Sequence, residues 1–340
     1  MVNCSPMRPR LLVSAGRDLF ASFFPSAHEA RLSRSFNWER IAARTTNMAF
    51  NRKLAMADGL LTTWDSPYLG PDLLPTAPKL RIIAHCGGEV KSRFATPLFD
   101  KLTITNSAGP MARATAELGA VFLLYCARDV DRYRDSLRKP SSREYSNVHL
   151  HGTAEYLANR DVAMIGFGRV GRALVDLLRG FDLHWIVYDP FAPRALSEHY
   201  PIVFSELKPL LRRAQLLVLT AALTERTRGL LDRKALSMLP DGAVIINIAR
   251  GGLLDLAALT REVQRKRLRC ALDVTDPAEP LPVKHPLRKL PGAIVTPHIA
   301  GSSRQVRQQI ASTVMDDLED FFRGKAVKNR VTKAMLQRMT

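Results

Sequence analysis

The feature that most constrains the fold is a glycine-rich turn within VAMIGFGRVGRALVDLL, residues 162–178. Gly166, Gly168 and Gly171 directly follow an apolar run and open a helical pattern. The first glycine allows a tight turn, the second lets backbone approach a pyrophosphate, and the third permits close packing of helix against strand. The helix then offers free N–H groups and a partial positive charge to phosphates. Such spacing alone is weak evidence, but its setting predicts a dinucleotide-binding domain.

A carboxylate stands where the second strand of such a domain ends. The apolar run HWIVYD, residues 184–189, finishes at Asp189. A carboxylate there can accept hydrogen bonds from both ribose hydroxyls of NAD and repels the 2′-phosphate of NADP. The alternative is an unliganded turn with Asp189 as a loop residue beside Pro190. Strand, turn, helix, strand and acid in register favour NAD as the cofactor.

The rest of the chain continues the same alternation of short apolar runs and helical patterns, which predicts α/β architecture with parallel sheets. Its 340 residues exceed the usual size of one domain, so we expect two. A polar loop at 139–155 separates two series, and a last helix from Ser302 to about Phe322 has no strand to feed. A largely buried long helix is expected over 111–130. The expected strands are 10–13, 59–64, 80–86, 101–107, 161–166, 184–189, 215–220, 243–248, 269–274 and 293–297.

Composition limits the setting of the protein. No apolar run approaches the 18 residues of a membrane span, and the N-terminus lacks the apolar core of a signal peptide. Four scattered cysteines, without a CxxC pair, suit a reducing compartment and favour neither disulfides nor a structural metal site. We therefore expect a cytoplasmic protein with no membrane partner and no metal.

The formal net charge of +18 is the unusual property. It is compatible with nucleic acid, an anionic membrane or an anionic small molecule as a partner. The basic runs 260–269 and 137–144 contain intervening acids and lack the interleaved aromatic residues of a stacking platform. Solvent-facing helix surfaces are the favoured interpretation, so we do not expect nucleic-acid binding.

Three polar residues follow predicted strands, where open α/β sheets place their ligands. Arg250 comes after 243–248, Glu279 after 269–274, and His298 after 293–297. Arg250 offers planar, permanently charged donors to a substrate carboxylate. His298 could exchange a proton with a ketone or hydroxyl group, oriented by Glu279. Together they predict an oxidoreductase acting on 2-hydroxy or 2-oxo acids.

Each of these residues also has a structural interpretation. Arg250 could cap its strand, His298 could be a hydrogen-bonded loop residue, and Glu279 could be a solvated acid whose partner role belongs to Asp276. The two glycines after Arg250 are expected to let the backbone turn away from the guanidinium. The clustering at one sheet edge beside a dinucleotide loop favours the functional interpretation.

The ordered motifs resemble those of the D-isomer-specific 2-hydroxyacid dehydrogenases, the family of phosphoglycerate dehydrogenase and glyoxylate/hydroxypyruvate reductase. The similar segments cover most of residues 105–303: 105–128, 165–190, 223–255, 271–287 and 296–303. The resemblance implies a doubly wound NAD-binding domain at 105–301, inserted in a flavodoxin-like substrate domain formed by 1–104 and 302–340. It also implies a homodimer that uses the long helix.

The resemblance implies roles for individual residues as well. Arg250, Glu279 and His298 would be catalytic. The carboxylate of the substrate would meet Arg250 and the loop Cys86, Gly87 and Gly88. The NAD site would comprise Gly166, Gly168, Arg169, Val170, Gly171, Asp189, Thr227, Ile248, Ala249, Asp273 and Gly301.

Two departures from the family pattern are visible. The substrate loop usually reads like GxGxD, whereas this chain has HCGGEVK over 85–91, with Glu89 and Lys91 in place of the familiar residues. A proline usual before the TERTRG segment is absent from LTAALTERT, residues 219–227. The first departure leaves the substrate open, and Trp64 is a further candidate for the lining of the cleft.

The leading hypothesis is an NAD-dependent enzyme that interconverts a D-2-hydroxy acid and its 2-oxo acid. An NAD-sensing corepressor of the same fold is the alternative, since +18 would suit a chromatin setting. The formate dehydrogenases share the cofactor domain, but their catalytic histidine is partnered by Gln, and Glu279 argues against them.

Overall fold

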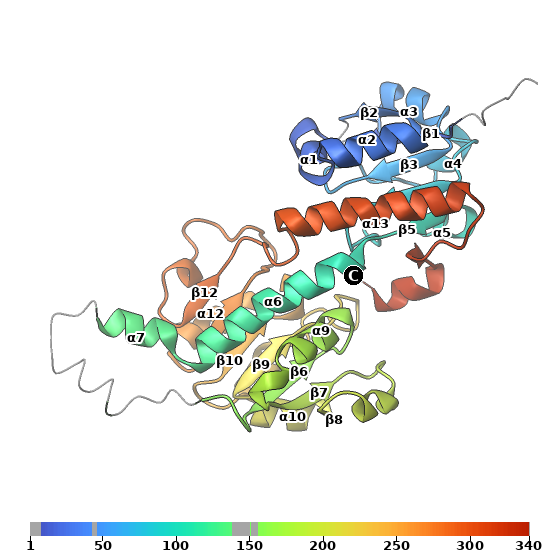
Figure 1. The fold of residues 1–340 in the computed structure, drawn as a ribbon. Coiled ribbons are helices and arrows are strands. Elements are labelled where there is room, and N and C mark those ends of the chain that lie inside the picture. The colour runs from blue at the N-terminus through green and yellow to red at the C-terminus, as the bar shows by residue number, and fades with distance from the viewer. Residues whose placement is uncertain (1–7, 43–45, 138–149, 151–155, 340) are drawn as a thin grey trace, which may run out of the picture. The chain divides into compact units, whose positions relative to one another are not determined.

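The computed structural model describes residues 8–42, 46–137, 150 and 156–339, and it divides into two compact units that are described separately here (Figure 1). Unit 1 comprises Met1–Met111 and Ser302–Thr340, and unit 2 comprises Ala112–Gly301. The polar loop expected over 139–155 lies outside the described residues except for position 150. No helix in the described part of the chain is both long and apolar enough to cross a membrane.

Unit 1 is built on a six-stranded sheet in the order β13-β5-β4-β3-β1-β2. The first five strands along the chain pair in parallel, and β13 joins β5 antiparallel. The parallel part therefore has the flavodoxin-like order 2-1-3-4-5. The strands are β1 (Arg10–Ser14), β2 (Asn37–Ile41), β3 (Gly59–Thr62), β4 (Ile82–His85), β5 (Thr103–Thr105) and β13 (Arg330–Val331).

The last long helix of the chain, α13, belongs to unit 1, where it contacts α1, α2 and β4. The side chain of Ser303 caps its first turn by accepting from the Val306 N–H (3.3 Å). Val306, Ile310 and Val314, spaced four residues apart, are buried on one face. The helices of unit 1 are α1 (Arg17–Phe23), α2 (Ser26–Ser35), α3 (Met48–Leu54), α4 (Leu73–Thr76), α5 (Leu98–Lys101) and α13 (Arg304–Phe322).

Unit 2 contains a seven-stranded, wholly parallel sheet in the order β12-β11-β10-β9-β6-β7-β8. Counted along the unit, β8-β7-β6-β9-β10-β11 gives 3-2-1-4-5-6, the doubly wound order of dinucleotide-binding domains. The strands are β6 (Asp161–Ile165), β7 (His184–Tyr188), β8 (Ile202–Phe204), β9 (Leu216–Leu219), β10 (Val244–Asn247), β11 (Arg269–Leu272) and β12 (Ala293–Val295).

Both faces of this sheet are buried. Leu217 and Ile245 belong to one core cluster, and their neighbours Val218 and Ile246 belong to another. Because alternate side chains enter separate cores, the central strands read as continuous apolar runs. The helices are α6 (Ala108–Ala127), which begins in unit 1, α7 (Val130–Ser136), α9 (Arg169–Leu177), α10 (Leu207–Arg213), α11 (Arg233–Ser237) and α12 (Leu256–Gln264). Short 3₁₀ turns are η1 (Arg179–Phe181), η2 (Arg194–Glu198), η3 (Gly251–Leu253), η4 (Pro286–Arg288) and η5 (Lys333–Arg338).

The predicted fold class is confirmed: all ten expected strands are present, nine of them within the ranges given for them, and β1 extends one residue further, to Ser14. The long helix runs over Ala108–Ala127 rather than 111–130. Three strands were not expected, namely β2, β8 and β13, and each is an edge strand of its sheet. β2 mixes polar and apolar residues, and β8 and β13 are only three and two residues long, so none of them gives the long apolar run of a central strand.

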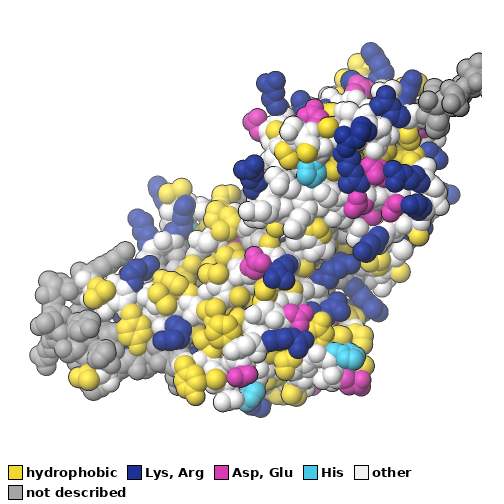
Figure 2. Space-filling model, in the orientation of Figure 1, with side chains coloured by type: hydrophobic (Ala, Val, Ile, Leu, Met, Phe, Trp, Pro, Cys, Tyr) yellow, Lys and Arg dark blue, Asp and Glu magenta, His cyan; other side chains and the backbone are white. Residues whose placement is uncertain are grey.

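The positive charge is distributed rather than gathered. On the face drawn in Figure 2, Lys and Arg side chains lie on both units, interspersed with Asp and Glu. Mixed charge of this kind is typical of a solvated surface.

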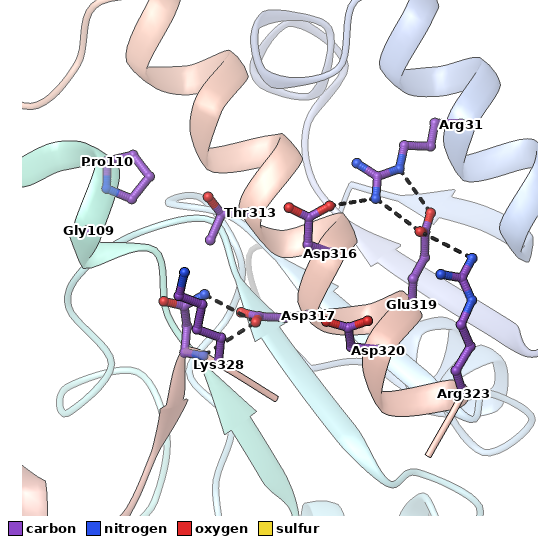
Figure 3. Close-up of a pocket in the computed structure, with 11 residues that line it drawn as sticks. Arg31, Gly109, Pro110, Thr313, Asp316, Asp317, Glu319, Asp320, Arg323 and Lys328 are labelled. Atoms are coloured by element: carbon purple, nitrogen blue, oxygen red, sulfur yellow. Dashed lines mark hydrogen bonds and ion pairs between the residues drawn. The ribbon is translucent and has the colours of Figure 1, made fainter. Parts of the chain in front are cut away.

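A concentration of acids does occur on α13, at a pocket of unit 1 (Figure 3). Arg31 of α2 pairs there with Asp316 (2.6 Å) and Glu319 (2.9 Å). Asp317 is only 2% exposed, and its Oδ1 accepts from the Asn329 N–H (3.3 Å) and side-chain amide (3.1 Å). Its Oδ2 has no hydrogen-bond partner among the residues that the structure describes. Burial raises the pKa of Asp317, and the two bonds from Asn329 offset the rise only in part.

The first prediction concerns Asp317→Asn. The asparagine Oδ1 can accept both bonds from Asn329, while the buried charge is removed. A carboxyl group whose pKa is raised on folding holds its proton more tightly in the folded protein than in the unfolded chain. The free energy of unfolding therefore falls as the pH rises toward that pKa. The melting temperature of the variant should therefore gain on the wild type as the pH rises above about 4, the ordinary pKa of an aspartate. Calorimetry of both proteins, with the exposed Asp316→Asn as control, measures this; a difference that does not change with pH would contradict it.

Candidate functional site

The glycine-rich turn follows β6, and its first glycine is required by the backbone. Gly166 has a φ of +91°, and a Cβ there would lie 2.5 Å from the Cα of Ala221. Its N–H donates to the carbonyl of Tyr188 at the end of β7 (2.9 Å). A side chain would therefore strain the turn and collide with the chain that follows β9.

The other two glycines have different surroundings. A Cβ on Gly168, which caps the N-terminus of α9, would meet nothing within 4 Å. A Cβ on Gly171 would lie 2.9 Å from the Sδ of Met164 and 3.0 Å from the carbonyl oxygen of Gly166. Gly171 thus permits the helix to pack on β6, and Gly168 leaves the approach to the helix N–H groups open. These residues fit the pyrophosphate of a dinucleotide.

Asp189 connects the glycine turn to the end of β7. Its Oδ2 accepts from the Phe167 N–H (2.7 Å), and its Oδ1 accepts from the Phe191 (2.8 Å) and Ala192 (3.1 Å) N–H groups. The half-buried carboxylate is therefore fixed beside the turn, with lone pairs left to accept ribose hydroxyls. This position fits the adenosine ribose of NAD.

The predicted catalytic residues follow three neighbouring strands of unit 2. Arg250 follows β10, Glu279 follows β11, and His298 follows β12, and these strands lie side by side. The Nδ1 of His298 forms an ion-pair contact with the Oε1 of Glu279. The two side chains remain 47% and 35% exposed, so the imidazole can reach a ligand while Glu279 fixes its orientation. The structure brings Glu279, not Asp276, to His298; Asp276 faces Arg228 instead (3.6 Å).

Arg250 is held through its backbone and its neighbours. Its carbonyl accepts from the Asn247 side-chain amide (2.9 Å), and its Nη1 donates to the Ala249 carbonyl (2.7 Å). A Cβ on Gly251 would lie 2.2 Å from the carbonyl carbon of Thr275, in the segment after β11. The expectation that the glycines serve to turn the backbone is corrected here: neither has a positive φ, and Gly251 is required by close approach between two strand ends.

Asp273 organises the segment that carries His298. Its carboxylate is 1% exposed and accepts from the Thr296 hydroxyl (2.6 Å) and from the N–H groups of Ile299 (2.8 Å) and Ala300 (2.9 Å). Its carbonyl accepts from the His298 N–H (2.9 Å). His298 itself has a left-handed backbone, with a φ of +56°. The segment is thus wrapped around one buried carboxylate, which offsets the strain at His298.

The remaining residues predicted for the cofactor lie in unit 2 with different exposures. The Thr227 hydroxyl accepts from the Thr224 N–H (2.7 Å) and donates to the Ala222 carbonyl (2.7 Å), so it holds the segment after β9 together. Arg169 is exposed at the start of α9 and Val170 is half-buried, whereas Ile248, Ala249 and Gly301 are buried. In the described part of the chain, no three His, Cys, Asp or Glu side chains converge as a metal site.

The predicted substrate loop belongs to unit 1 and follows β4. The Cys86 N–H donates to Thr62 (2.8 Å) and the Gly87 N–H to His85 (2.9 Å), both to carbonyl oxygens. Among the described residues, the Gly88 N–H has no such acceptor. Burial raises the pKa of the Cys86 thiol, which is fully enclosed. Of the three residues, Gly88 alone is placed to offer a backbone donor.

The sequence interpretation overlooked Asn247, Asn106 and Ser107 as residues that hold these segments, and it named Asp273 only for the NAD site. Asn247 and Asp273 lie at the ends of β10 and β11, and Asn106 and Ser107 follow β5. The same rule that singled out Arg250, a polar residue at the carboxyl end of a predicted strand, would have found them.

Comparison with known proteins places this arrangement in a family. Residues 120–300 match the family model described as D-isomer specific 2-hydroxyacid dehydrogenase, NAD binding domain, which is more than half of the chain. The chain belongs to the D-isomer specific 2-hydroxyacid dehydrogenase family. The resemblance inferred from the motifs is thereby confirmed, and unit 2 contains the family's NAD-binding domain.

Individual relatives cover different shares of the chain. A D-3-phosphoglycerate dehydrogenase of Methanocaldococcus jannaschii is 27% identical over 76% of this chain but only 49% of its own length, so the match spans about half of that relative. A glyoxylate reductase of Aeropyrum pernix is 27% identical over 97% of this chain and 98% of its own length. The crystal structure of a phosphoglycerate oxidoreductase from Rhizobium etli superposes with a TM-score of 0.75 at 26% identity, covering 95% of this chain and 98% of the other.

The second prediction tests Asp273. In Asp273→Asn one acceptor oxygen becomes an amide that faces backbone donors, so at least one charge-assisted hydrogen bond, worth about 1.5–3 kcal/mol, is lost. Hydrogen exchange at the Ile299 and Ala300 amides should become faster, and the free energy of unfolding should fall by about 2–3 kcal/mol.

Asp276→Asn is the matched control, since it removes an exposed acid from the same stretch of chain. Mass-spectrometric hydrogen exchange and denaturant unfolding of both variants make the comparison. Unchanged exchange at the two amides in Asp273→Asn would show that the carboxylate does not hold the segment.

Proposed function

We propose that this protein is an NAD-dependent oxidoreductase that interconverts a D-2-hydroxy acid and its 2-oxo acid. The observation that carries the proposal is the contact between His298 and Glu279. These residues follow β12 and β11, and Arg250 follows β10, the next strand of the same sheet. The glycine turn and Asp189 belong to the same unit. A histidine oriented by a carboxylate can transfer a proton, and an arginine can bind a carboxylate. The glycine turn supports the cofactor.

In the reducing direction, bound NADH supplies the hydride that the protein cannot provide. His298 donates a proton from its Nε2 to the ketone oxygen, and in the oxidising direction the same atom accepts the hydroxyl proton. Glu279 contacts Nδ1, so it orients the ring with Nε2 free for the substrate. Arg250 anchors the carboxylate in two-point contact, which fixes the carbonyl relative to the imidazole.

NAD rather than NADP is proposed because Asp189 is an anion at the ribose end of the site. A 2′-phosphate would meet this carboxylate, which already accepts three backbone N–H groups and cannot easily turn away. We further propose glyoxylate or hydroxypyruvate as substrates, because relatives that match this chain are described as a glyoxylate reductase and a hydroxypyruvate reductase. A cytoplasmic location is proposed with them.

The third prediction is the activity itself. With NADH the protein should reduce glyoxylate, hydroxypyruvate or a related 2-oxo acid, and NADPH should serve less well. Arg250→Ala should lower kcat/KM by about 10²–10³-fold through loss of a charged anchor worth about 3–4 kcal/mol. His298→Ala should lower kcat by about 10²–10⁴-fold while NADH binding, followed by fluorescence titration, is retained.

The controls are Arg261→Ala and His199→Ala, which make the same changes at exposed positions outside the site. A spectrophotometric panel of 2-oxo acids with both cofactors supplies the rates. Normal turnover in Arg250→Ala would contradict the proposal that Arg250 binds the substrate carboxylate. If the wild type is inactive with every 2-oxo acid yet binds NADH, a binding protein of the same fold is favoured.

The proposed homodimer rests on a group of exposed apolar side chains. Val121 of α6 is 57% exposed, Val130 of α7 is 41% exposed, and Leu137, Leu150 and Tyr156 are each more than 70% exposed. Large apolar side chains exposed at these described positions are typical of a protein interface. The long helix α6 would thus lie at the contact between two copies.

The fourth prediction tests that contact. Val121→Glu places a charge in the proposed apolar interface, where its desolvation is costly, so the dimer should dissociate to monomers. Val283→Glu is the matched control, because Val283 is 77% exposed in the loop between β11 and η4 of unit 2. Size-exclusion chromatography with light scattering gives the masses, and a Val121→Glu protein that remains dimeric would contradict the assignment.

A further inference from the structure

The segment after β5 donates hydrogen bonds to carbonyl groups of the loop after β4. The Ser107 N–H donates to the Gly87 carbonyl (2.8 Å), and the Asn106 side-chain amide donates to the Gly88 carbonyl (2.8 Å). The Ser107 hydroxyl adds a longer bond to the His85 carbonyl (3.3 Å). Asn106 is 5% exposed and Ser107 is fully buried, so these bonds form away from solvent.

These bonds fix the direction of the N–H groups on the other side of the same peptide planes. In a trans peptide the C=O and the following N–H point in opposite directions. Because the carbonyls of Gly87 and Gly88 point toward the segment after β5, the N–H groups of Gly88 and Glu89 point away from it. Among the described residues, neither N–H has a hydrogen-bond acceptor.

The side chain of Glu89 does not occupy these donors. Its Oε1 accepts from the Ser92 N–H (2.7 Å) and its Oε2 from the Ser92 hydroxyl (2.6 Å). The carboxylate is thus bound within its own turn, and the two backbone donors remain available. Two adjacent N–H groups that both point away from the same segment are suited to the oxygens of one carboxylate.

We propose that Asn106 and Ser107 are positioning residues for the substrate: they aim the Gly88 and Glu89 N–H groups at the carboxylate of the 2-oxo acid. This inference rests on the proposed function and adds residues that touch the loop but not the substrate. The side-chain amide of Asn106 is the critical part. Among the described residues it is the only group bonded to the peptide between Gly88 and Glu89, and glycine imposes little barrier to rotation of that peptide.

Asn106 is itself held from the opposite side. Its N–H donates to the Asn329 carbonyl (3.3 Å), and Asn329 is anchored by two hydrogen bonds to Asp317 of α13, drawn in Figure 3. The first residue of α6, Ala108, follows only two positions after Asn106. The loop after β4 is therefore bound to the segment where the chain leaves the sheet of unit 1 and enters the long helix α6.

The fifth prediction compares two substitutions of Asn106. In Asn106→Ala the loop loses one buried hydrogen bond, worth about 1–1.5 kcal/mol, so the KM for glyoxylate should rise about tenfold. Asn106→Asp should raise it further, since a carboxylate repels the Gly88 carbonyl and accepts the Glu89 N–H once the peptide rotates. The kcat should stay within about twofold and the KM for NADH should not change, because only binding of the carboxylate is weakened.

Thr105→Val is the matched control. The Thr105 hydroxyl is buried one residue away and has no hydrogen-bond partner in the described part of the chain, so its removal disturbs the same strand without touching the loop. Its KM for glyoxylate should equal that of the wild type. Calorimetric titration of oxamate, a non-reacting carboxylate analogue, into each protein with NADH should show the same order of affinities.

The outcomes separate the inference from the function on which it rests. An active wild type with an unchanged KM in Asn106→Ala overturns the positioning role alone. So does a variant in which kcat, the KM for NADH and the melting temperature all worsen together, because a general structural role would produce that result. A wild type that neither reduces any 2-oxo acid nor binds oxamate overturns both.

Discussion

The loops assigned to cofactor and substrate depend on one kind of interaction, a hydrogen bond between a short polar side chain at a strand end and the backbone of a neighbouring loop. Asp189 holds the glycine turn, Asn247 holds the backbone around Arg250, and Asp273 holds the segment of His298. Asn106 does the same for the loop after β4 in unit 1. Parallel strands end at one edge, so Asp189, Asp273 and Asn106 each stand beside the loop of an adjacent strand, whereas Asn247 binds the residues that follow its own strand.

This arrangement explains why loops with different chemical tasks are held by the same kind of hydrogen bond. A loop must leave its functional group exposed, which deprives it of burial as a source of rigidity. A carboxylate or amide that is itself buried can supply the missing restraint, since its hydrogen bonds are stronger where water is excluded. His298 is the clearest case: its left-handed backbone is retained because Asp273 binds the residues on both sides of it.

The sequence predicted what depends on local pattern and missed what depends on neighbours across a sheet. Buried central strands, the glycine turn and Asp189 carry their own signals, because continuous apolar runs and glycines at fixed spacing are visible in one segment. The edge strands β2, β8 and β13 are partly exposed; β2 has no continuous apolar run, and β8 and β13 are only three and two residues long. Gly251 was noticed, but its reason was misread, since the close approach to Thr275 exists only when β10 and β11 lie side by side.

The same distinction bears on the loop HCGGEVK, whose Glu89 and Lys91 depart from the family pattern. If the substrate carboxylate is received by backbone N–H groups, the side chains at these positions need not contact it. Asn106 and Ser107 bind carbonyl groups, which every residue possesses. The backbone N–H groups of the loop can therefore keep their direction when the side chains of the loop change. Glu89 is turned back onto Ser92, and Lys91 is exposed. Variation at these two positions is therefore free to tune which acid is bound without altering how its carboxylate is held.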